Sequence, residues 1–74
     1  MVRPNIVPEN RLLGKQEWDC LHLFAGGKSA HEIALKKHRS EFSINSYLRS
    51  AKDKLQAKTL AHAIFRAYEL GIFP

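Results

Sequence analysis

The stretch SAHEIALKKHRSEFSINSYLRSAKDKL, residues 29–55, contains the signals that decide the fold. Ser29 and Glu32 have the spacing of a capping box, in which each side chain bonds a backbone N–H that would otherwise be unpaired. Ser40 is a second expected N-cap, followed by Glu41 in the first turn, where the helix dipole favours an acidic side chain. We therefore expect a short helix from 30 to about 37, a tight turn, and a helix from about 41 to 55.

The second of these helices has the clearest periodicity in the chain. An apolar stripe with the spacing i, i+4, i+7 and i+11 is formed by Ile44, Leu48, Ala51 and Leu55. At about 100° per residue, the opposite face carries Phe42, Asn45, Ser46, Arg49 and Asp53 and is polar apart from the phenylalanine. Two short helices joined by a tight turn, the second with a polar outer face, describe a helix-turn-helix, whose second helix enters the major groove of DNA.

Helices are also expected on both sides of this unit. Apolar residues at positions 18, 21, 24 and 25 predict a helix over 15–25, which Gly26 and Gly27 end. Thr59 is the expected N-cap of a last helix, from about 59 to 70, which Gly71 ends. No segment has the alternation of a strand, so we expect an all-α fold of four helices within residues 13–74.

Length and composition set further limits. The 74 residues, 45% of them apolar, suffice for one small domain that needs no stabilising disulfide or metal ion. Because Cys20 is the single cysteine, neither an intramolecular disulfide nor a cysteine zinc cluster is possible. There is no apolar run long enough to span a membrane and no signal-peptide core, so an intracellular protein is expected. Residues 1–12, with Pro4 and Pro8, predict an extended linker.

The net charge of +5 lies in the middle of the chain. Residues 28–58 contain eight Lys and Arg against three Asp and Glu, whereas 1–27 and 59–74 each sum to zero. A basic segment is either a solvated surface or the binding surface for a polyanion. Because this one coincides with the expected helix-turn-helix, it favours double-stranded DNA as the partner.

Several short motifs follow one known pattern along residues 13–73. They are Leu13-Gly14-x-x-Glu17-x-x-x-Leu21, Gly27-x-Ser29-x-x-Glu32-Ile33-Ala34, Ser40-x-x-Ser43-Ile44-x-x-x-Leu48, Lys54-Leu55, Ala63 and Leu70-Gly71-Ile72. In this pattern the chain resembles the C-terminal DNA-binding domain of LuxR-type transcription regulators. Among them it looks most like the quorum-sensing regulators of the TraR kind, which share an arginine at the position of Arg49.

This resemblance implies a four-helix domain that binds DNA as a symmetric dimer and regulates transcription in the bacterial cytoplasm, with RNA polymerase as a further partner. A sensor domain normally precedes this module in the family. The resemblance implies that the sensed acyl-homoserine lactone would bind that missing domain, and that the 74 residues need no cofactor.

The resemblance places base-reading positions on Asn45 and Arg49, with Ser46 beside them. Arginine offers a fork of donors to guanine O6 and N7, and asparagine pairs with adenine N6 and N7. Arg49 can alternatively clamp a phosphate, since half or more of protein–DNA hydrogen bonds go to phosphate and sugar. The expected phosphate contacts are Lys28, Ser29, Ser40, Ser43, Tyr47, Lys52 and Lys54.

The last helix has more apolar surface than one contact face can bury. Either a small core needs all of it, or its outer side makes a two-fold dimer contact, for which Leu60, Ala63, Ile64 and Ala67 are the candidates. An alternative function also follows: a basic helical module that docks a polymerase subunit, an antiactivator or another acidic partner. Salt dependence separates this module from a DNA-binding protein.

The chain departs from the family pattern at a few positions. Gly14 replaces a usual Ser or Thr N-cap, and Gln56 replaces a Gly at the end of the second HTH helix. Arg39 stands where an apolar residue usually anchors the turn, and Phe42 where a polar one is usual. Phe42 either folds back over the site that Arg39 leaves open or contacts a thymine methyl group, and we expect the packed position.

Other conspicuous residues have structural explanations. Trp18 and Cys20 lie on or beside an apolar helical face and are expected in the core. Glu17 is either an acid beside the dipole of the first helix or the partner of a basic residue in the helix-turn-helix. The histidines at 22, 31, 38 and 62 form no i, i+4 pair, so no metal site is expected. Cys20, His22 and Asp19 have the residue types of a catalytic set, but residues two apart face apart on a helix, so no enzyme is expected.

Overall fold

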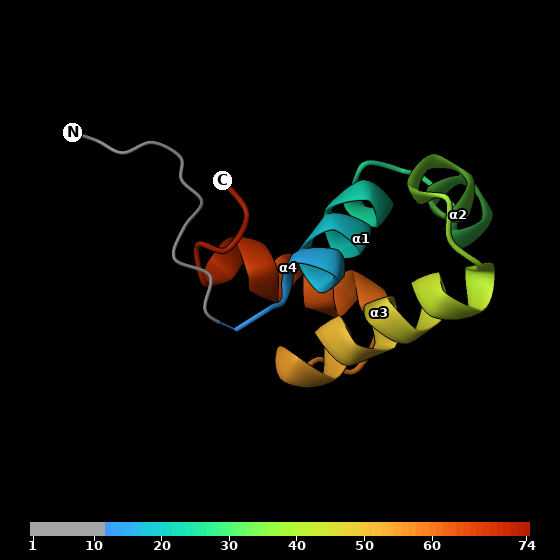
Figure 1. The fold of residues 1–74 in the computed structure, drawn as a ribbon. Coiled ribbons are helices and arrows are strands. Elements are labelled where there is room, and N and C mark those ends of the chain that lie inside the picture. Colours follow the sequence, from blue (N-terminus) through green and yellow to red (C-terminus); the bar gives the residue numbers. More distant parts are fainter. Residues whose placement is uncertain (1–11) are drawn as a thin grey trace.

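The computed structural model describes residues 12–74, which fold into a bundle of helices (Figure 1). Within these residues there are four helices and no strand: α1 (Lys15–Ala25), α2 (Ala30–Lys37), α3 (Glu41–Lys54) and α4 (Leu60–Glu69). The expected all-α class is confirmed, and each helix begins and ends within one residue of the expected position. The expected linker, 1–12, lies outside the described residues except for Leu12.

Side-chain caps explain where three of the helices begin. The Ser29 Oγ accepts from the Glu32 backbone N–H at 3.1 Å, and the Glu32 Oε1 accepts from the Ser29 backbone N–H at 2.8 Å, which completes the capping box of α2. Ser40 and Thr59 accept in the same manner from the backbone of the third helical residue of α3 and α4, at 3.1 and 3.0 Å. The helix starts are thus encoded locally.

The core forms around α3, which packs against each of the other three helices (Figure 1). The predicted stripe of Ile44, Leu48, Ala51 and Leu55 is at most 2% exposed. The remaining buried apolar residues come from the other helices and from both flanks of the bundle: Leu13, Cys20, Leu21, Ile33, Ala34, Ala63, Ala67, Ile72 and Phe73. The inward face of α3 is therefore fully buried in the core.

The predicted core positions of Trp18 and Cys20 are confirmed. Cys20 has no exposed surface, and its burial raises the pKa of the thiol, so the thiolate that would react is disfavoured. Trp18 is half-buried against the core, stacks on His22, and donates from Nε1 to the Ile72 carbonyl at 3.1 Å. This bond attaches the end of the chain to α1.

The dimer residues predicted on α4 need a correction. Ala63 and Ala67 are 0% exposed because α4 turns its small side chains toward the core, where they allow close helix packing. They have no surface left for a second copy. The exposed apolar side chains of α4 are instead Phe65, 62% exposed, and Tyr68, 52% exposed, while Leu60 and Ile64 are half-buried at the edge of the core.

The end of α3 explains the family preference for glycine at position 56. Gln56 has φ = +55°, in the left-handed region that costs a residue with a Cβ roughly 1–2 kcal/mol. Gly71, after α4, has φ = +77° and meets the same requirement without that cost. Gln56 is therefore a locally unfavourable residue that the rest of the fold holds in place.

Candidate functional site

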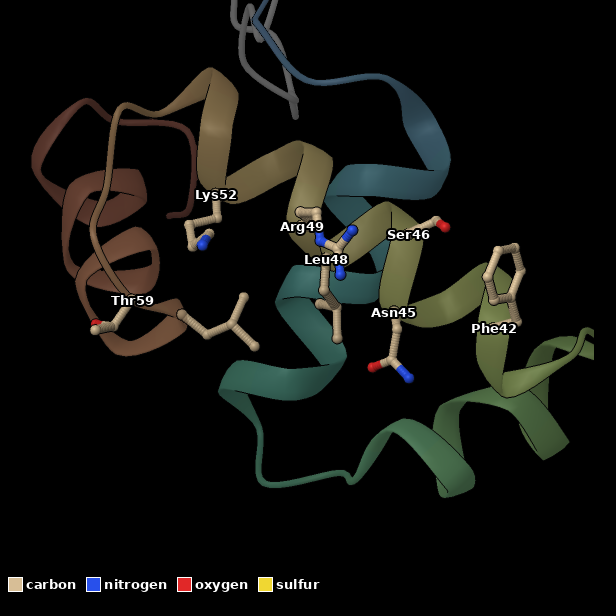
Figure 2. Close-up of a pocket in the computed structure, with 8 residues that line it drawn as sticks. Phe42, Asn45, Ser46, Leu48, Arg49, Lys52 and Thr59 are labelled. Atoms are coloured by element: carbon tan, nitrogen blue, oxygen red, sulfur yellow. The ribbon is translucent and has the colours of Figure 1, made fainter.

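A groove runs along the outward side of α3 and reaches the start of α4 (Figure 2). Its lining combines apolar side chains with polar and charged ones: Phe42, Asn45, Ser46, Leu48, Arg49, Lys52, Thr59 and Leu60. Figure 2 shows that the side chains follow α3 from Phe42 at its beginning to Lys52 toward its end, with Thr59 across the groove. We call Phe42, Asn45, Ser46 and Arg49 the outer face of α3; all four are exposed.

The structure brings four predicted contact residues together in this groove. Asn45, Ser46, Arg49 and Lys52 come from consecutive turns of α3; Arg49 follows Asn45 by four positions and Ser46 by three, and Lys52 follows Arg49 by three, which keeps them on one side of the helix. None of the hydrogen bonds or ion pairs found within residues 12–74 involves the side chains of Asn45, Ser46 or Arg49. Their donors and acceptors therefore face solvent and are available to a ligand.

The expected phosphate contacts at the helix starts lie apart from the groove. Lys28 and Ser29 are exposed at the beginning of α2, and the Ser29 hydroxyl is used by the cap. Ser40 and Ser43 lie at the beginning of α3, with their hydroxyl oxygens 3.1 Å apart. Both clusters present a helix N-terminus, where backbone N–H groups and the dipole favour an anion.

The start of α2 and the start of α3 are also joined by a side-chain contact between a histidine and a carboxylate. The His31 Nδ1 lies 2.8 Å from the Glu41 Oε2, and both side chains are more than half exposed. An exposed pair of this kind contributes little stability. It does hold the two helix N-termini of the helix-turn-helix side by side.

Two of the basic residues of segment 28–58 are neutralised by carboxylates of α1. Lys37 lies 3.1 Å from the Asp19 Oδ2, and Lys54 lies 2.8 Å from the Glu17 Oε1. By contrast, Lys28, Lys36, Arg49, Lys52 and Lys58 have no ion pair within the part of the chain that the structure describes. The positive charge that remains unpaired thus includes both cations of the groove.

This distribution corrects the interpretation of Lys54. It was expected to contact phosphate, but its ammonium group is bonded to Glu17 and turned toward α1. The reason is a tertiary contact between residues 37 positions apart in sequence, which charge counting cannot reveal. Lys52, two residues earlier, points into the groove instead (Figure 2).

Glu17 serves both of the roles that the sequence left open. Its Oε1 accepts from the backbone N–H of the N-cap residue Gly14 at 2.8 Å, and the Glu17 carboxylate also accepts from Lys54 and from the Ser50 hydroxyl. Burial raises the pKa of this carboxyl, but the bonds from Lys54, Ser50 and Gly14 lower it by more, so the pKa of Glu17 lies below the usual value of a glutamate. The charged form therefore stabilises the attachment of α3 to α1.

The expected packing of Phe42 is wrong. Its side chain is 80% exposed, and the space beside Arg39 is covered differently: the Arg39 guanidinium lies 5.8 Å from the centre of the Tyr47 ring and donates to the Tyr47 hydroxyl at 3.4 Å. Phe42 cannot fold back because it lies in the first turn of α3 on the side opposite the buried Ile44 stripe. Tyr47, expected at the DNA backbone, is half-buried and has this arginine as its neighbour.

Three residues of the groove were missed by the sequence analysis, and one of them, Leu48, was assigned only to the core. Thr59 was interpreted only as a helix cap, and Leu60 only as a dimer residue, yet both line the groove opposite Arg49. A partial indication was present in the sequence, because the short turn between α3 and α4 keeps the start of α4 close to the end of α3. Which side of the bundle the chain returns to depends on packing, so the spacing alone did not reveal it.

The described residues were also compared with the requirements of a metal site and of a membrane-spanning helix, and they meet neither. Among residues 12–74, no three His, Cys, Asp or Glu side chains are grouped so that they could hold a metal ion. No described helix is both long and apolar enough to cross a bilayer.

Comparison with known proteins identifies a family model that covers most of the chain. The GerE model, described as bacterial regulatory proteins of the luxR family, matches residues 11–67, from just before α1 into α4. A comparison with curated proteins gave no match.

Proposed function

The chain belongs to the luxR family of bacterial regulatory proteins, and on this premise we propose that it binds specific DNA sequences with the outer face of α3 in the major groove. The observation that carries the proposal is the division of this helix. One face is committed to the core, and the other presents exposed, unpartnered polar groups and an unpaired arginine. A helix of this kind fits the width of the major groove.

Three side chains of the outer face supply base contacts. Arg49 donates two hydrogen bonds to guanine O6 and N7, and Asn45 both donates to and accepts from an adenine. Ser46, one residue after Asn45, reaches an adjacent base edge. These residues lie in the first three turns of α3, and the N-terminal part of a recognition helix is the part that meets bases.

Phosphate contacts come from the periphery of the same surface. Phosphates on either side of the DNA major groove are bound by the start of α2, with Lys28 and Ser29, and by the start of α3, with Ser40 and Ser43. Lys52 and Tyr47 complete the set. These contacts set the position of α3 on the duplex and contribute the salt-dependent part of the affinity.

A dimer on a two-fold DNA site uses the exposed side of α4. Phe65 and Tyr68 are exposed on the side of this helix away from the buried Ala63 and Ala67, and Ile64 borders them at the edge of the core. Pairing this side with a second copy would bury the apolar rings, and a two-fold site one turn of DNA apart requires two α3 helices about 34 Å apart. One helix pair buries little area, so DNA is expected to strengthen the dimer.

A salt titration tests the function and separates it from docking to a protein. A random-sequence DNA selection with the 74-residue chain first yields the preferred site. Affinity for this duplex should then fall linearly with the logarithm of salt concentration, with a slope set by the number of phosphate contacts. If no sequence is enriched and binding is insensitive to salt, the proposal fails and the exposed α4 face favours a protein partner.

A single measurement also tests the dimer. Analytical ultracentrifugation with the selected duplex should give two chains per site, with the two half-sites related by two-fold symmetry. One chain on a palindromic duplex would contradict the dimer while leaving DNA binding intact. The variant Phe65→Ala should weaken the two-chain complex more than it weakens binding to a single half-site.

A further inference from the structure

Phe42 is the most exposed large apolar side chain within residues 12–74, at 80%. Scattered apolar residues on a surface are common and need no explanation by themselves. Phe42 differs in its position, because it belongs to the same groove as Asn45, Ser46 and Arg49 (Figure 2). No ring contact found in the described part of the chain involves Phe42.

The spacing along α3 links Phe42 to the proposed base-reading residues. It precedes Asn45 by three positions and Ser46 by four, so all three occupy adjacent turns on one side of the helix. It also lies in the first turn, closest to the end of a recognition helix that penetrates the major groove. A duplex that meets Asn45 and Arg49 would therefore also cover Phe42.

The chemistry of the major groove restricts what an exposed phenyl ring can recognise there. Base edges present hydrogen-bond donors and acceptors, which a phenyl ring cannot satisfy, and one apolar group, the C5 methyl of thymine. Phosphates and sugars offer no better match. The thymine methyl is thus the group whose burial against Phe42 is favourable and specific for sequence.

We propose that Phe42 is a specificity-determining residue that packs against a thymine C5 methyl, next to the base read by Asn45. This inference rests on the proposed function and extends it from hydrogen-bonding residues to an apolar one. Positions 42, 45 and 49 then read neighbouring bases along the major groove of DNA. Phe42 remains exposed in the free protein because its packing partner is on the DNA.

Replacing thymine by uracil tests this contact, since the two bases differ only in the methyl group. In the duplex obtained from the DNA selection, each thymine is replaced by deoxyuridine in turn and the dissociation constant is measured. Loss of one buried methyl should weaken binding about fourfold at one position of each half-site. In Phe42→Ala, which has no ring to contact the methyl, the uracil and thymine duplexes should bind equally at that position.

Phe65 provides the matched control, because it is a second exposed phenylalanine that lies on α4, outside the groove. Phe65→Ala should keep the fourfold preference for thymine over uracil, even if its overall affinity changes. Circular dichroism should show both variants folded, since both side chains are largely exposed.

The possible results separate this inference from the proposed function. If the wild-type chain selects no DNA sequence, both are overturned. If it selects a sequence but no thymine methyl contributes to affinity, or if Phe42→Ala retains the preference for thymine, only the contact made by Phe42 is overturned. Loss of the preference in Phe42→Ala alone supports the contact.

Discussion

The two faces of α3 (Glu41–Lys54) have opposite relations to the rest of the molecule. The inner face, Ile44, Leu48 and Ala51, is at most 2% exposed and meets all three neighbouring helices. The outer face, represented by Asn45 and Arg49, is exposed and contacts no other part of the described chain through its polar groups. One helix therefore carries stability on one face and the proposed recognition on the opposite face, so substitutions should separate the two properties.

The largest effect is expected from Leu48→Ala on the inner face. Leu48 is 2% exposed, and removing its side chain leaves a cavity, so the free energy of unfolding should fall by about 2–5 kcal/mol. Urea or thermal unfolding followed by circular dichroism measures this loss. The neighbouring variant Arg49→Ala is the control and should change stability by less than about 0.5 kcal/mol. A similar loss in both variants would break the distinction between the faces.

Arg49→Ala should affect DNA binding where Leu48→Ala affects folding. Loss of the forked contact should weaken binding to the selected duplex by about 1–3 kcal/mol and relax the preference at one base position. Arg49→Lys keeps the charge but not the fork, so it should retain the salt dependence without restoring the base preference. Unchanged affinity and preference in Arg49→Ala would show that another surface reads the bases.

The edge between the two faces, where Glu17 meets Ser50 and Lys54, should respond to pH. Because the pKa of Glu17 is lowered in the folded state, its contribution to stability is present above the unfolded-state pKa of a glutamate and is lost as the pH falls through the lower folded-state pKa. Glu17→Gln should cost about 1–2 kcal/mol at pH 7, less than a fully buried pair because Lys54 is half exposed.

Unfolding measured from pH 7 to pH 3 should also be less steep in Glu17→Gln than in the wild type. Asp19, whose pKa is lowered by its bonds to Lys37 and Lys15 despite the raising effect of burial, titrates in both proteins and serves as the common background. Identical pH profiles would show that Glu17 does not stabilise the attachment of α3.

The smallest expected effect compares two lysines of the last turn of α3. Lys52→Ala removes an unpaired cation from the groove, so it should weaken binding evenly across DNA sequences and lower the salt slope by about one. Lys54→Ala removes a cation already bonded to Glu17, so it should reduce stability and leave the salt slope nearly unchanged. An equal change of slope in both would mean that Lys54 leaves Glu17 for the DNA.

Local sequence signals were sufficient for the helices. Ser29, Ser40 and Thr59 mark helix starts because a side-chain cap is made within four residues, and the i, i+4 apolar stripe of α3 corresponds directly to the buried side of the helix. Family resemblance then identified the class of domain, which the GerE match confirms. The base and phosphate contacts remain predictions.

Tertiary contacts explain the expectations that failed. The apolar residues of α4 cover more than one side of the helix, so periodicity could not show that Ala63 and Ala67 face inward while Phe65 faces solvent. The partner of Lys54 comes from α1, far away in sequence. Phe42 was expected to fold back over the site that Arg39 leaves open, but it is 80% exposed on the outward face, where the periodicity of α3 places it.

The most direct test of the account maps the contact surface on isotope-labelled protein by NMR, as the selected duplex is added. The side-chain amide of Asn45 and the Nε–H of Arg49 should show the largest shifts. The Nε–H of Arg66, which donates to the Leu55 carbonyl at 2.9 Å, is an internal control and should stay in place. If the largest shifts fell instead on Gln16, Lys36 and Arg39, which line a separate pocket between α1 and α2, the outer face of α3 would not be the recognition surface.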